Sequence, residues 1–466
     1  MLTTPVGPDT EAKARWPLVL VFIAALVVRL ALLAAGPWSE PERAIMPDSG
    51  RYLLLADNLR DYGKFGKADE EGSPWTQVAA IRARNGTLPP TDANGLRPES
   101  MRTPGYPAFL RLAQFAGGGT RIVLVVQSLL GALGACALVG IAEAVGLSRA
   151  RSLAVGWVWA LHPGVLIRDL VVLTESTYLS CTVFALWFAS RRERWSGGVL
   201  SGLLLGASGL IRPMVGFLAL PALLALIAKR NAKPIQAAAL AILGCFAPSA
   251  AWVVRNQAVG EGARFSSLGD LTLLYHGAGY TISEERGEDW IKTWPDRIAE
   301  LSERLEARVR PGDDVITAAR RMAVEEIRAR PVPFARVLVK SQVKLFLSHS
   351  LSDFYQVLGR PYRPSGLFSR WVLRESEEGE GSLWGVFFAL AWVGLNGAIA
   401  MLALVGTVGA VRRRDLVLVA CALWVALVAA GTLSNGLERL RMGMVVPLLL
   451  LAASAHLRRT GPAADT

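Results

Sequence analysis

The stretch RIVLVVQSLLGALGACALVGI, residues 121–141, is the clearest structural signal in the chain. It carries no charged side chain after Arg121, and its length matches the roughly 20 helical residues that cross the hydrocarbon core of a bilayer. A helix satisfies its backbone hydrogen bonds internally, which lipid requires of any spanning segment. We therefore expect residues 121–141 to form a transmembrane helix.

Further apolar segments repeat this pattern on both sides. We place them near 17–36, 152–168, 170–190, 197–212, 213–228, 234–255, 383–410, 415–433 and 441–457. Composition agrees, because 52% of the 466 residues are hydrophobic, 19% are charged and the mean hydropathy is +0.36. A soluble chain of this length would normally divide into several domains. The sequence predicts an all-α polytopic membrane protein with about ten transmembrane helices.

Basic residues gather in alternate connections between these segments. They include Lys13 and Arg15, the stretches 149–151, 191–194, 229–233 and 412–414, and Arg458 with Arg459. Under the positive-inside rule this side is cytoplasmic, so both termini are inside and the long loops 37–120 and 256–382 are outside. Because the net charge of +12 is distributed over these short clusters, no basic face for nucleic acid is expected.

Two amphipathic helices are predicted in the first long loop. PDSGRYLLLADNLRDYG, residues 47–63, has Ser49 as a cap, an apolar face with Tyr52 and Leu55, and Gly63 at its end. Such a helix should lie in the membrane interface. A second helix begins within RTPGYPAFLRL, residues 102–112, with Thr103 as its cap and Pro104 in the first helical position.

Asp48 stands directly before the first of these helices. The positive end of a helix helps to keep such a carboxylate ionised. An ionised carboxylate held at the membrane surface suits a general base that removes a proton from a hydroxyl group. An aspartate at this position also serves simply as a helix cap. The residues alone leave both interpretations open.

Other charged residues lie near the outer surface or slightly within the membrane. HPGVLIRDLVVLTESTYLS, residues 162–180, contains Asp169 and Glu175, which are six residues apart and so are not neighbours on one helix face. An ionised acid at this depth in the membrane has a high free energy, so Glu175 either faces a polar cavity or binds a neighbouring helix. Arg29, inside the first predicted span, is expected to be a tertiary anchor or a site residue.

Arginines recur at the predicted outer helix ends, namely Arg102, Arg212, Arg255, Arg439 and Arg441. The planar guanidinium group matches phosphate oxygens, so converging arginines would suit a phosphorylated lipid headgroup. Taken singly, each arginine also fits an interfacial anchor that extends to the headgroups. The stretch PDRIAELSERLEARVR, residues 295–310, is expected to be helical and to cover the cavity beneath the second long loop.

Six fragments occur in the order found in the GT-C glycosyltransferases. They are PDSGRYLLLADNL (47–59), RTPGYPAFL (102–110), TESTYLS (174–180), GLIRP (209–213), RNQAVGEGARFSSLGDLTLLYHG (255–277) and ERLRMGMVVPLLLLAA (438–453). The chain resembles a bacterial member of the protein mannosyltransferase family, glycosyltransferase family 39, which includes the lipid A aminoarabinose transferases. The resemblance covers nearly the whole chain.

This resemblance implies a GT-C fold and an inverting transferase in the bacterial cytoplasmic membrane, with its site facing the periplasm or cell exterior. It would move a sugar from a polyprenyl-phosphate donor to a lipid or glycan acceptor, with a protein acceptor still open. Residues 1–260 would form the catalytic transmembrane module, 261–382 a partly helical outer region and 383–466 the C-terminal transmembrane helices. We expect a monomer among membrane lipids that binds no nucleic acid.

The resemblance also implies roles for individual residues. Asp48 matches the family's essential acid, and Glu175 resembles the acid of the next outer connection. Arg51, Tyr52 and Arg102 match positions near the donor phosphate, and Arg255 resembles the charge after the seventh span. Further candidates for substrate binding are Asp169, Arg212, His276, Arg439 and Arg441.

No cofactor is expected, although a divalent metal stays open. No second aspartate forms a DxD pair with Asp48, and His162, His276 and His349 lack the spacing of metal ligands. An oligosaccharide ligase and a lipid-linked sugar transporter without transferase activity are the alternative functions. A transporter should show internal repeats and broken midplane helices. A noncatalytic scaffold would leave Asp48 more than about 15 Å from Glu175 and from every candidate arginine.

Overall fold

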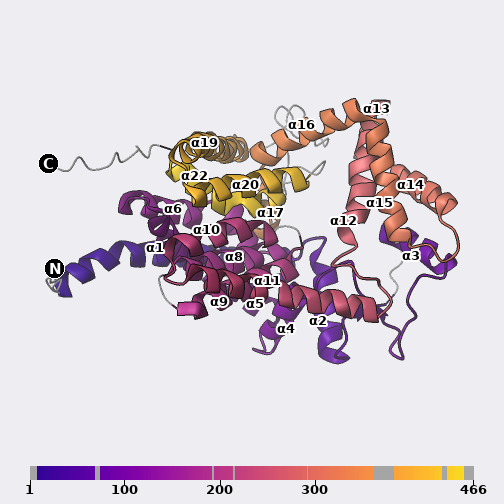
Figure 1. The fold of residues 1–466 in the computed structure, drawn as a ribbon, viewed down its shortest axis with the longest axis horizontal. Helices are drawn as coiled ribbons and strands as arrows, with labels where there is room; N and C mark the ends of the chain where they lie inside the picture. The colour runs from indigo at the N-terminus through magenta and orange to yellow at the C-terminus, as the bar shows by residue number, and fades with distance from the viewer. Residues whose placement is uncertain are drawn as a thin grey trace.

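A computed structural model describes residues 8–68, 74–191, 194–213, 216–290, 292–360, 383–432 and 438–455. The protein is all-α, with 78% of the described residues helical. In the described residues, the strands are the two-residue pair β1 (Gly66–Lys67) and β2 (Arg97–Pro98), which lie antiparallel with Gly66 opposite Pro98. Helices therefore determine the architecture (Figure 1).

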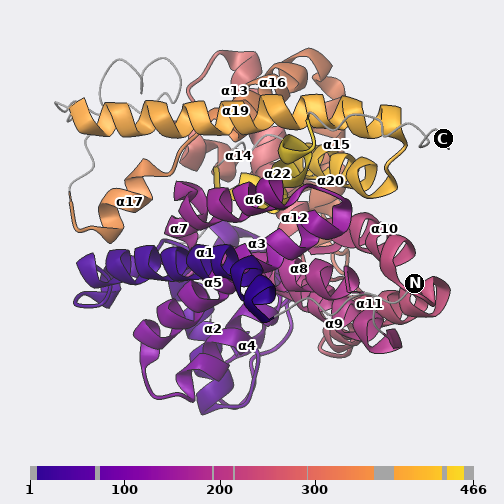
Figure 2. The same cartoon turned by 90° about the vertical axis from the view of Figure 1, so that its left-hand side faces the viewer.

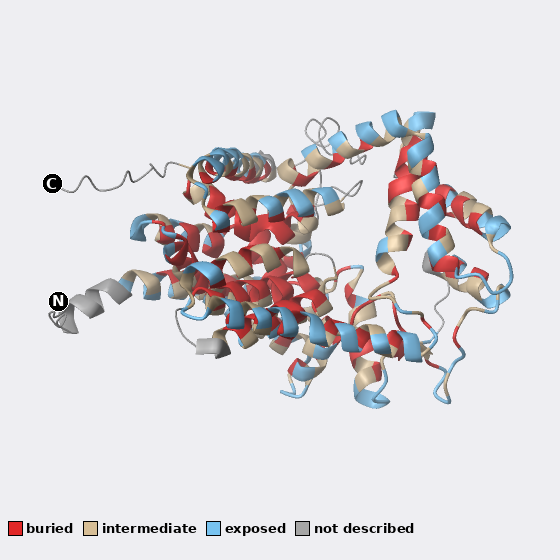
Figure 3. Cartoon of the chain, in the orientation of Figure 1, coloured by how far each residue is buried: buried red, intermediate tan, exposed pale blue. Residues whose placement is uncertain are grey.

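Most helices form one large bundle, which contains the main hydrophobic core (Figures 1 and 3). Its helices are α1 (Pro8–Ala35), α5 (Gly119–Val145), α6 (Arg149–Leu161), α7 (Pro163–Asp169), α8 (Thr174–Ala189), α9 (Arg194–Ile211), η2 (Gly216–Ala219), α10 (Leu220–Arg230), α11 (Pro234–Ala258), α19 (Leu383–Arg413), α20 (Leu416–Thr432), α21 (Glu438–Arg441), η5 (Met442–Met444) and α22 (Val445–Ala453). Figure 2 shows α19 along one face of the bundle, where it packs against α22 and α20.

Four helical segments within the described residues are long and apolar enough to cross a membrane. They are Trp16–Ala35, Gly119–Val145, Pro234–Ala258 and Phe387–Arg413, and the bent pair α7 and α8 would make a fifth. Large apolar side chains such as Val27, Leu243 and Met401 are exposed on α1, α11 and α19. Exposed apolar surface of this extent needs a nonaqueous partner. These features fit a membrane protein.

Helices occupy all ten segments in which spans were predicted, but several are shorter than expected. The segment 152–168 is interrupted at His162, which has an extended backbone. Pro163 explains the break, because proline lacks an N–H and disfavours helical geometry in the preceding residue. The segment 170–190 becomes helical only at Thr174, and the chain bends by 109° between α7 and α8. The ten-span topology therefore stays a prediction.

Helices α9 and α11 approach each other through small residues. Gly198, Gly202 and Gly206 lie one turn apart on α9, and an added Cβ at each would come within 2.6 Å of a carbonyl oxygen of α11. Small residues at this spacing allow two helix backbones to pack directly, which is common where lipid supplies no hydrophobic drive. The glycines are therefore required by the close contact.

A buried ion pair joins α1 to α7. Arg29 donates from Nε to Asp169 at 2.7 Å and from Nη1 to the carbonyls of Ala25 and Ala160, and its side chain is fully buried. Arg29 is thus a tertiary anchor, one of the two roles expected from its position in an apolar span. The ion pair also fixes the end of α7 ahead of the turn into α8.

The first long loop is largely ordered. It contains η1 (Pro41–Ala44), α2 (Ser49–Asp61), α3 (Pro74–Arg84) and α4 (Gly105–Gln114). Helix α2 ends beside Gly63, as predicted, and packs against α4 with Leu55 buried. The predicted start of the second helix is one residue early, because Thr103 and Pro104 precede α4.

Helix α3 joins the second loop in a smaller unit, which we call the side domain (Figure 1). The side domain consists of α3, α12 (Leu268–Thr272), the π-helical turn η3 (Leu273–Ala278), α13 (Gly279–Arg286), α14 (Trp294–Arg308) and α15 (Val315–Ala329). Its separate core joins Val78 and Ile81 of α3 to residues of these helices. Helix α14 confirms the predicted helix in 295–310.

Two more helices connect the side domain to the bundle. Helix α16 (Pro331–Leu347) packs against α13 at the side domain and against α19 and α21 of the bundle. Helix α17 (Leu351–Val357) follows and contacts η1. The segment 256–382 is therefore tied to the bundle at both ends of its described part.

Candidate active site

The turn that carries Asp48 is fixed by the residue after it. Ser49 is fully buried, and its hydroxyl accepts from the Met46 N–H at 2.8 Å and donates to the Val172 carbonyl at 2.7 Å. The Val172 N–H in turn donates to Ala44 at 2.9 Å. Ser49 does not cap α2 as predicted, because this hydroxyl bonds the α7–α8 connection instead. The turn thus brings Asp48 close to the start of α8.

Two arginines bind the two carboxylate oxygens of Asp48. Arg102 Nη2 donates to Oδ1 at 3.1 Å, and Arg439 Nη1 donates to Oδ2 at 2.7 Å. The side chain of Arg102 is 8% exposed, whereas those of Asp48 and Arg439 are 32% and 35% exposed. Asp48 makes no capping hydrogen bond with α2. Its carboxylate therefore serves the arginine contacts rather than the helix.

These contacts determine the charge of Asp48. Burial alone would raise the pKa of Asp48, but the charges and hydrogen bonds of Arg439 and Arg102 outweigh it and lower the pKa from 3.8 to about 2. Asp48 is therefore an anion at any physiological pH. While both arginines bind it, the carboxylate is also a weak base.

Aromatic and backbone contacts hold Arg102 in place. Its guanidinium lies 4.6 Å from the centroid of the Tyr52 ring, and Tyr52 makes an edge contact with Tyr106 at 5.2 Å. Tyr106 donates to Gln127 at 3.0 Å, and Gln127 donates to the Val171 carbonyl at 2.9 Å. Arg102 is thus connected to the same α7–α8 turn that holds Asp48.

Glu175 forms a second ion pair at the start of α8. Arg212 Nη1 donates to Glu175 at 2.6 Å and to the Thr174 hydroxyl at 3.0 Å, and only 1% of the Glu175 side chain is exposed. Arg439 is close enough to Glu175 to interact with it electrostatically. Glu175 is therefore bound by Arg212 at the end of α9. Arg439 interacts electrostatically with Glu175 and also binds Asp48.

His276 approaches this group from the side domain. Its Nδ1 lies 2.7 Å from the Tyr280 hydroxyl, and its ring packs on Trp294 with centroids 4.4 Å apart. Burial and the nearby charge of Arg439 lower the pKa of His276 from 6.5 to about 4. His276 is therefore neutral at physiological pH and lies near Arg439.

Other predicted site residues bond elsewhere. Asp169 is occupied by Arg29 and by the Ser176 hydroxyl. Arg255 donates to the carbonyls of Phe65 and Glu99, beside the β1–β2 pair. Arg441 donates to three carbonyls at the end of α16, those of Leu345, Phe346 and Ser348. Arg255 and Arg441 thus support backbone segments around the site, whereas Asp169 holds Arg29 and Ser176.

Several residues at the site were not identified from the sequence. Thr174 bonds both members of the Glu175–Arg212 pair, and Tyr178 lies beneath Arg212 at 5.5 Å. Both belong to the TESTYLS fragment, in which only Glu175 was predicted to be a site residue. Arg51 was predicted and lies on α2 next to Tyr52, half-buried.

The cluster of Asp48, Arg102, Glu175, Arg212 and Arg439, which we call the Asp48 cluster, has a surplus of positive charge. Its three arginines bind two carboxylates. Guanidinium groups bind phosphate oxygens in pairs. Asp48 is thus surrounded by groups suited to a phosphate. In the described residues, no cluster of three or more histidine, cysteine or acidic side chains has the arrangement of a metal site.

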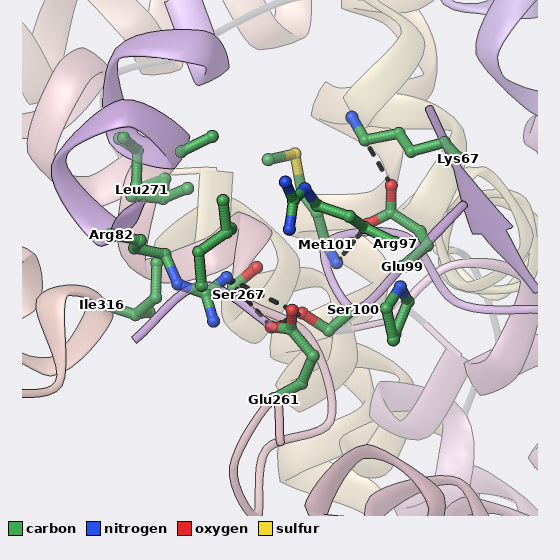
Figure 4. A pocket seen from close by; sticks show the side chains of 14 residues that line it. Lys67, Arg82, Arg97, Glu99, Ser100, Met101, Glu261, Ser267, Leu271 and Ile316 are labelled. Atoms are coloured by element: carbon green, nitrogen blue, oxygen red, sulfur yellow. Dashed lines mark hydrogen bonds and ion pairs between the residues drawn. The ribbon is translucent and has the colours of Figure 1, made fainter. Parts of the chain in front are cut away.

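A cavity of about 90 Å³ lies between α3, α12 and α15 of the side domain and the segment 97–101 (Figure 4). Its wall includes Glu99 and Met101, whose segment continues into Arg102. Across the cavity, Arg82 binds Glu261 at 3.1 Å and the Ser100 hydroxyl donates to the same carboxylate at 2.6 Å. These bonds connect α3 to the segment before Arg102. The cavity therefore adjoins the segment that holds Arg102.

No family model matches the chain, and the search of curated proteins found no match.

Proposed function

We propose that the protein is an inverting membrane glycosyltransferase of the GT-C type. It transfers a sugar from a polyprenyl-phosphate donor to a lipid or glycan acceptor. The single observation that carries the proposal is the double contact of Asp48 with Arg102 and Arg439. A candidate base lies between two cations that can hold an anionic leaving group.

The chemistry follows from these charges. The acceptor hydroxyl oxygen attacks the anomeric carbon of the donor, its proton passes to Asp48, and the bond from that carbon to the phosphate oxygen breaks. Negative charge then grows on the lipid phosphate, where Arg102 and Arg439 stabilise it. Orientation of the two reactants supplies a further part of the rate.

Donor binding would also prepare Asp48 for its role. In this structure Arg102 and Arg439 occupy both carboxylate oxygens. A donor phosphate that attracts Arg439 frees one oxygen to accept the hydroxyl proton. Since Arg439 is the more exposed of the two arginines, it is the one better placed to move. Loss of that contact raises the basicity of Asp48, as proton abstraction requires.

The membrane helices and the neighbouring ion pair are consistent with such a substrate. A polyprenyl chain needs apolar surroundings, which the bundle helices provide with their exposed apolar side chains. Glu175 and Arg212 lie next to the site and are held by Thr174. We assign Arg212 to the binding of polar substrate groups, with Glu175 holding its guanidinium group in place.

A transfer assay tests the proposal. The purified chain in lipid nanodiscs would receive radiolabelled polyprenyl-phosphate sugars together with membrane glycolipids. Asp48→Asn keeps the size of the side chain but removes the base, so we expect transfer to fall by at least a hundredfold. Arg102→Ala should weaken donor binding.

The matched control is Asp61→Asn on the same helix. Asp61 lies at the other end of α2, is 47% exposed and pairs with Arg60. Transfer by Asp61→Asn should equal that of the unmodified chain. Full transfer by a folded Asp48→Asn variant would refute the base assignment, and equal donor affinity of Arg102→Ala would refute the phosphate assignment.

A further inference from the structure

Four aromatic rings meet on the side domain, where His276 approaches the Asp48 cluster. We call His276, Tyr280, Trp290 and Trp294 the aromatic cluster. The ring centroids of Tyr280 and Trp290 are 4.2 Å apart, those of His276 and Trp294 are 4.4 Å apart, and those of Tyr280 and Trp294 are 5.5 Å apart. The rings come from η3, α13, α14 and the connection between α13 and α14.

Two observations relate the aromatic cluster to the Asp48 cluster. His276 lies within electrostatic range of Arg439, the residue that binds Asp48. Helix α16 packs against both α13 and α21, and its Lys344 lies 5.6 Å from the Trp290 ring centroid. Since α21 carries Arg439, the same helix borders the aromatic rings and the arginine that binds Asp48.

Packing of the side domain does not account for all four rings. Its core already contains fully buried side chains such as Leu274, Tyr275 and Leu301. By contrast, His276, Trp290 and Trp294 are each half-buried, although Trp294 touches this core. Tryptophan offers a large apolar face with one polar N–H, and partly exposed groups of such rings are typical of binding sites.

A sugar ring has the surface that this arrangement fits. One face of a hexose presents C–H groups, whose partial positive charge is attracted to the negative face of an aromatic ring. Its edges carry hydroxyl groups that need hydrogen-bond partners. His276 supplies such a partner, because its Nδ1 is bonded to Tyr280 and its Nε2 is a second polar atom of the same neutral ring.

We propose that the aromatic cluster binds a sugar ring of the acceptor, with Trp290 and Trp294 against the ring and His276 at its hydroxyl edge. The inference rests on the proposed function and narrows its acceptor to a carbohydrate. The sugar belongs either to a free glycan or to a lipid-linked one. In either case the acceptor hydroxyl is delivered to Asp48 from the side domain.

Binding measurements without donor test this assignment. The full chain in nanodiscs would be titrated with chitotetraose, mannotetraose, purified lipopolysaccharide and a peptide rich in serine and threonine. We expect at least one carbohydrate probe to bind. Trp290→Leu and Trp294→Leu should each raise its Kd about tenfold. Trp294→Phe keeps an aromatic face and should retain most of the affinity.

Trp38→Leu is the matched control, because Trp38 is 50% exposed and lies outside the aromatic cluster. It should bind the probes as the unmodified chain does. Binding of a tetrasaccharide would identify a free glycan as sufficient, and binding of lipopolysaccharide alone would identify a lipid-linked one. Unchanged affinity in both leucine variants, binding of the peptide alone, or no binding of any carbohydrate would overturn the inference.

A separate titration with polyprenyl phosphate distinguishes the two proposals. Trp294→Leu should leave donor-lipid affinity unchanged, since the aromatic cluster makes no contact assigned to the phosphate. Carbohydrate binding without any polyprenyl-phosphate binding would refute the proposed donor and retain the aromatic site. Donor binding with no carbohydrate binding would refute the aromatic site and retain the proposed donor.

Discussion

Replacing Arg439 by glutamine should change both the stability of the protein and its dependence on pH. Burial raises the pKa of Asp48, but Arg439 and Arg102 outweigh it and lower the pKa from 3.8 to about 2. This net shift corresponds to about 2 kcal/mol in favour of the ionised carboxylate. Arg439 is the larger of the two charge contributions. Its loss should therefore cost about 1–2 kcal/mol at neutral pH and return the pKa of Asp48 toward its ordinary value.

The pH dependence has a definite direction. The pKa of Asp48 is lower in the folded state than in the unfolded state, so its pairing stabilises the protein fully above about pH 5 and loses this effect as the pH falls toward about 2. The stability difference between the unmodified chain and Arg439→Gln should shrink over the same range. Guanidinium titrations in detergent, followed by tryptophan fluorescence from pH 3 to 7, would measure it.

Two further variants isolate the pair. Arg439→Lys keeps the charge and should recover much of the stability. Arg439 also acts on Glu175, so a double-mutant cycle with Asp48→Asn is needed to separate the Asp48 contribution. A stability difference that stays constant from pH 7 to pH 3, or a coupling energy near zero in the cycle, would contradict our account of Asp48.

Three other predictions concern the scaffold. Arg29→Leu leaves the buried carboxylate of Asp169 without its cation and should destabilise the protein by about 3–5 kcal/mol, seen as a loss of monodisperse protein after extraction in detergent. Gly202→Val places side-chain atoms where a Cβ alone would lie 2.2 Å from the Ala241 carbonyl oxygen, so the thermal midpoint should fall by several degrees, whereas Gly50→Ala, where an added Cβ meets nothing within 4 Å, should change it little. Arg441→Ala removes the donor to three carbonyls at the end of α16 and should speed hydrogen exchange in residues 345–350 without an equal change in α15.

Long apolar segments were the most predictable part of the fold. Helices α1, α5, α11 and α19 match their predicted ranges, because length and apolarity are properties of a continuous segment. The interruption at His162 follows from Pro163, but the predicted segment 152–168 ran across this proline. The sharp turn between α7 and α8 depends on the buried Asp169 and Ser49 contacts, which involve residues far apart in the sequence.

The composition of the site was partly predictable, whereas its pairing was not. Asp48, Glu175 and the arginines were all identified as candidates from their residue types and predicted depth. The partner of Asp48 could not be chosen, since Arg439 lies 391 residues away and five arginines had similar settings. Arg255 and Arg441 illustrate the difficulty, because an arginine at a helix end can bind backbone carbonyls as readily as phosphate.

The side domain was the least predictable part. Its core joins Val78 and Ile81 of α3, from the first long loop, to residues of α12–α15 from the second, and this long-range contact has no signal in either loop taken alone. The aromatic cluster lies within the second loop and was missed because its rings meet only after several short helices fold together. Only His276 was noted as a candidate, whereas Trp290 and Trp294 come together with it through the fold of η3, α13 and α14.

A structure of the chain with a nonhydrolysable polyprenyl-phosphonate sugar tests the central claim most directly. Cryo-electron microscopy in nanodiscs would locate the phosphonate group relative to Asp48. We expect its oxygens within about 3 Å of the Arg102 and Arg439 guanidinium groups, with one Asp48 oxygen released toward the anomeric carbon. A phosphonate bound elsewhere, with both arginines still on Asp48, would contradict the account.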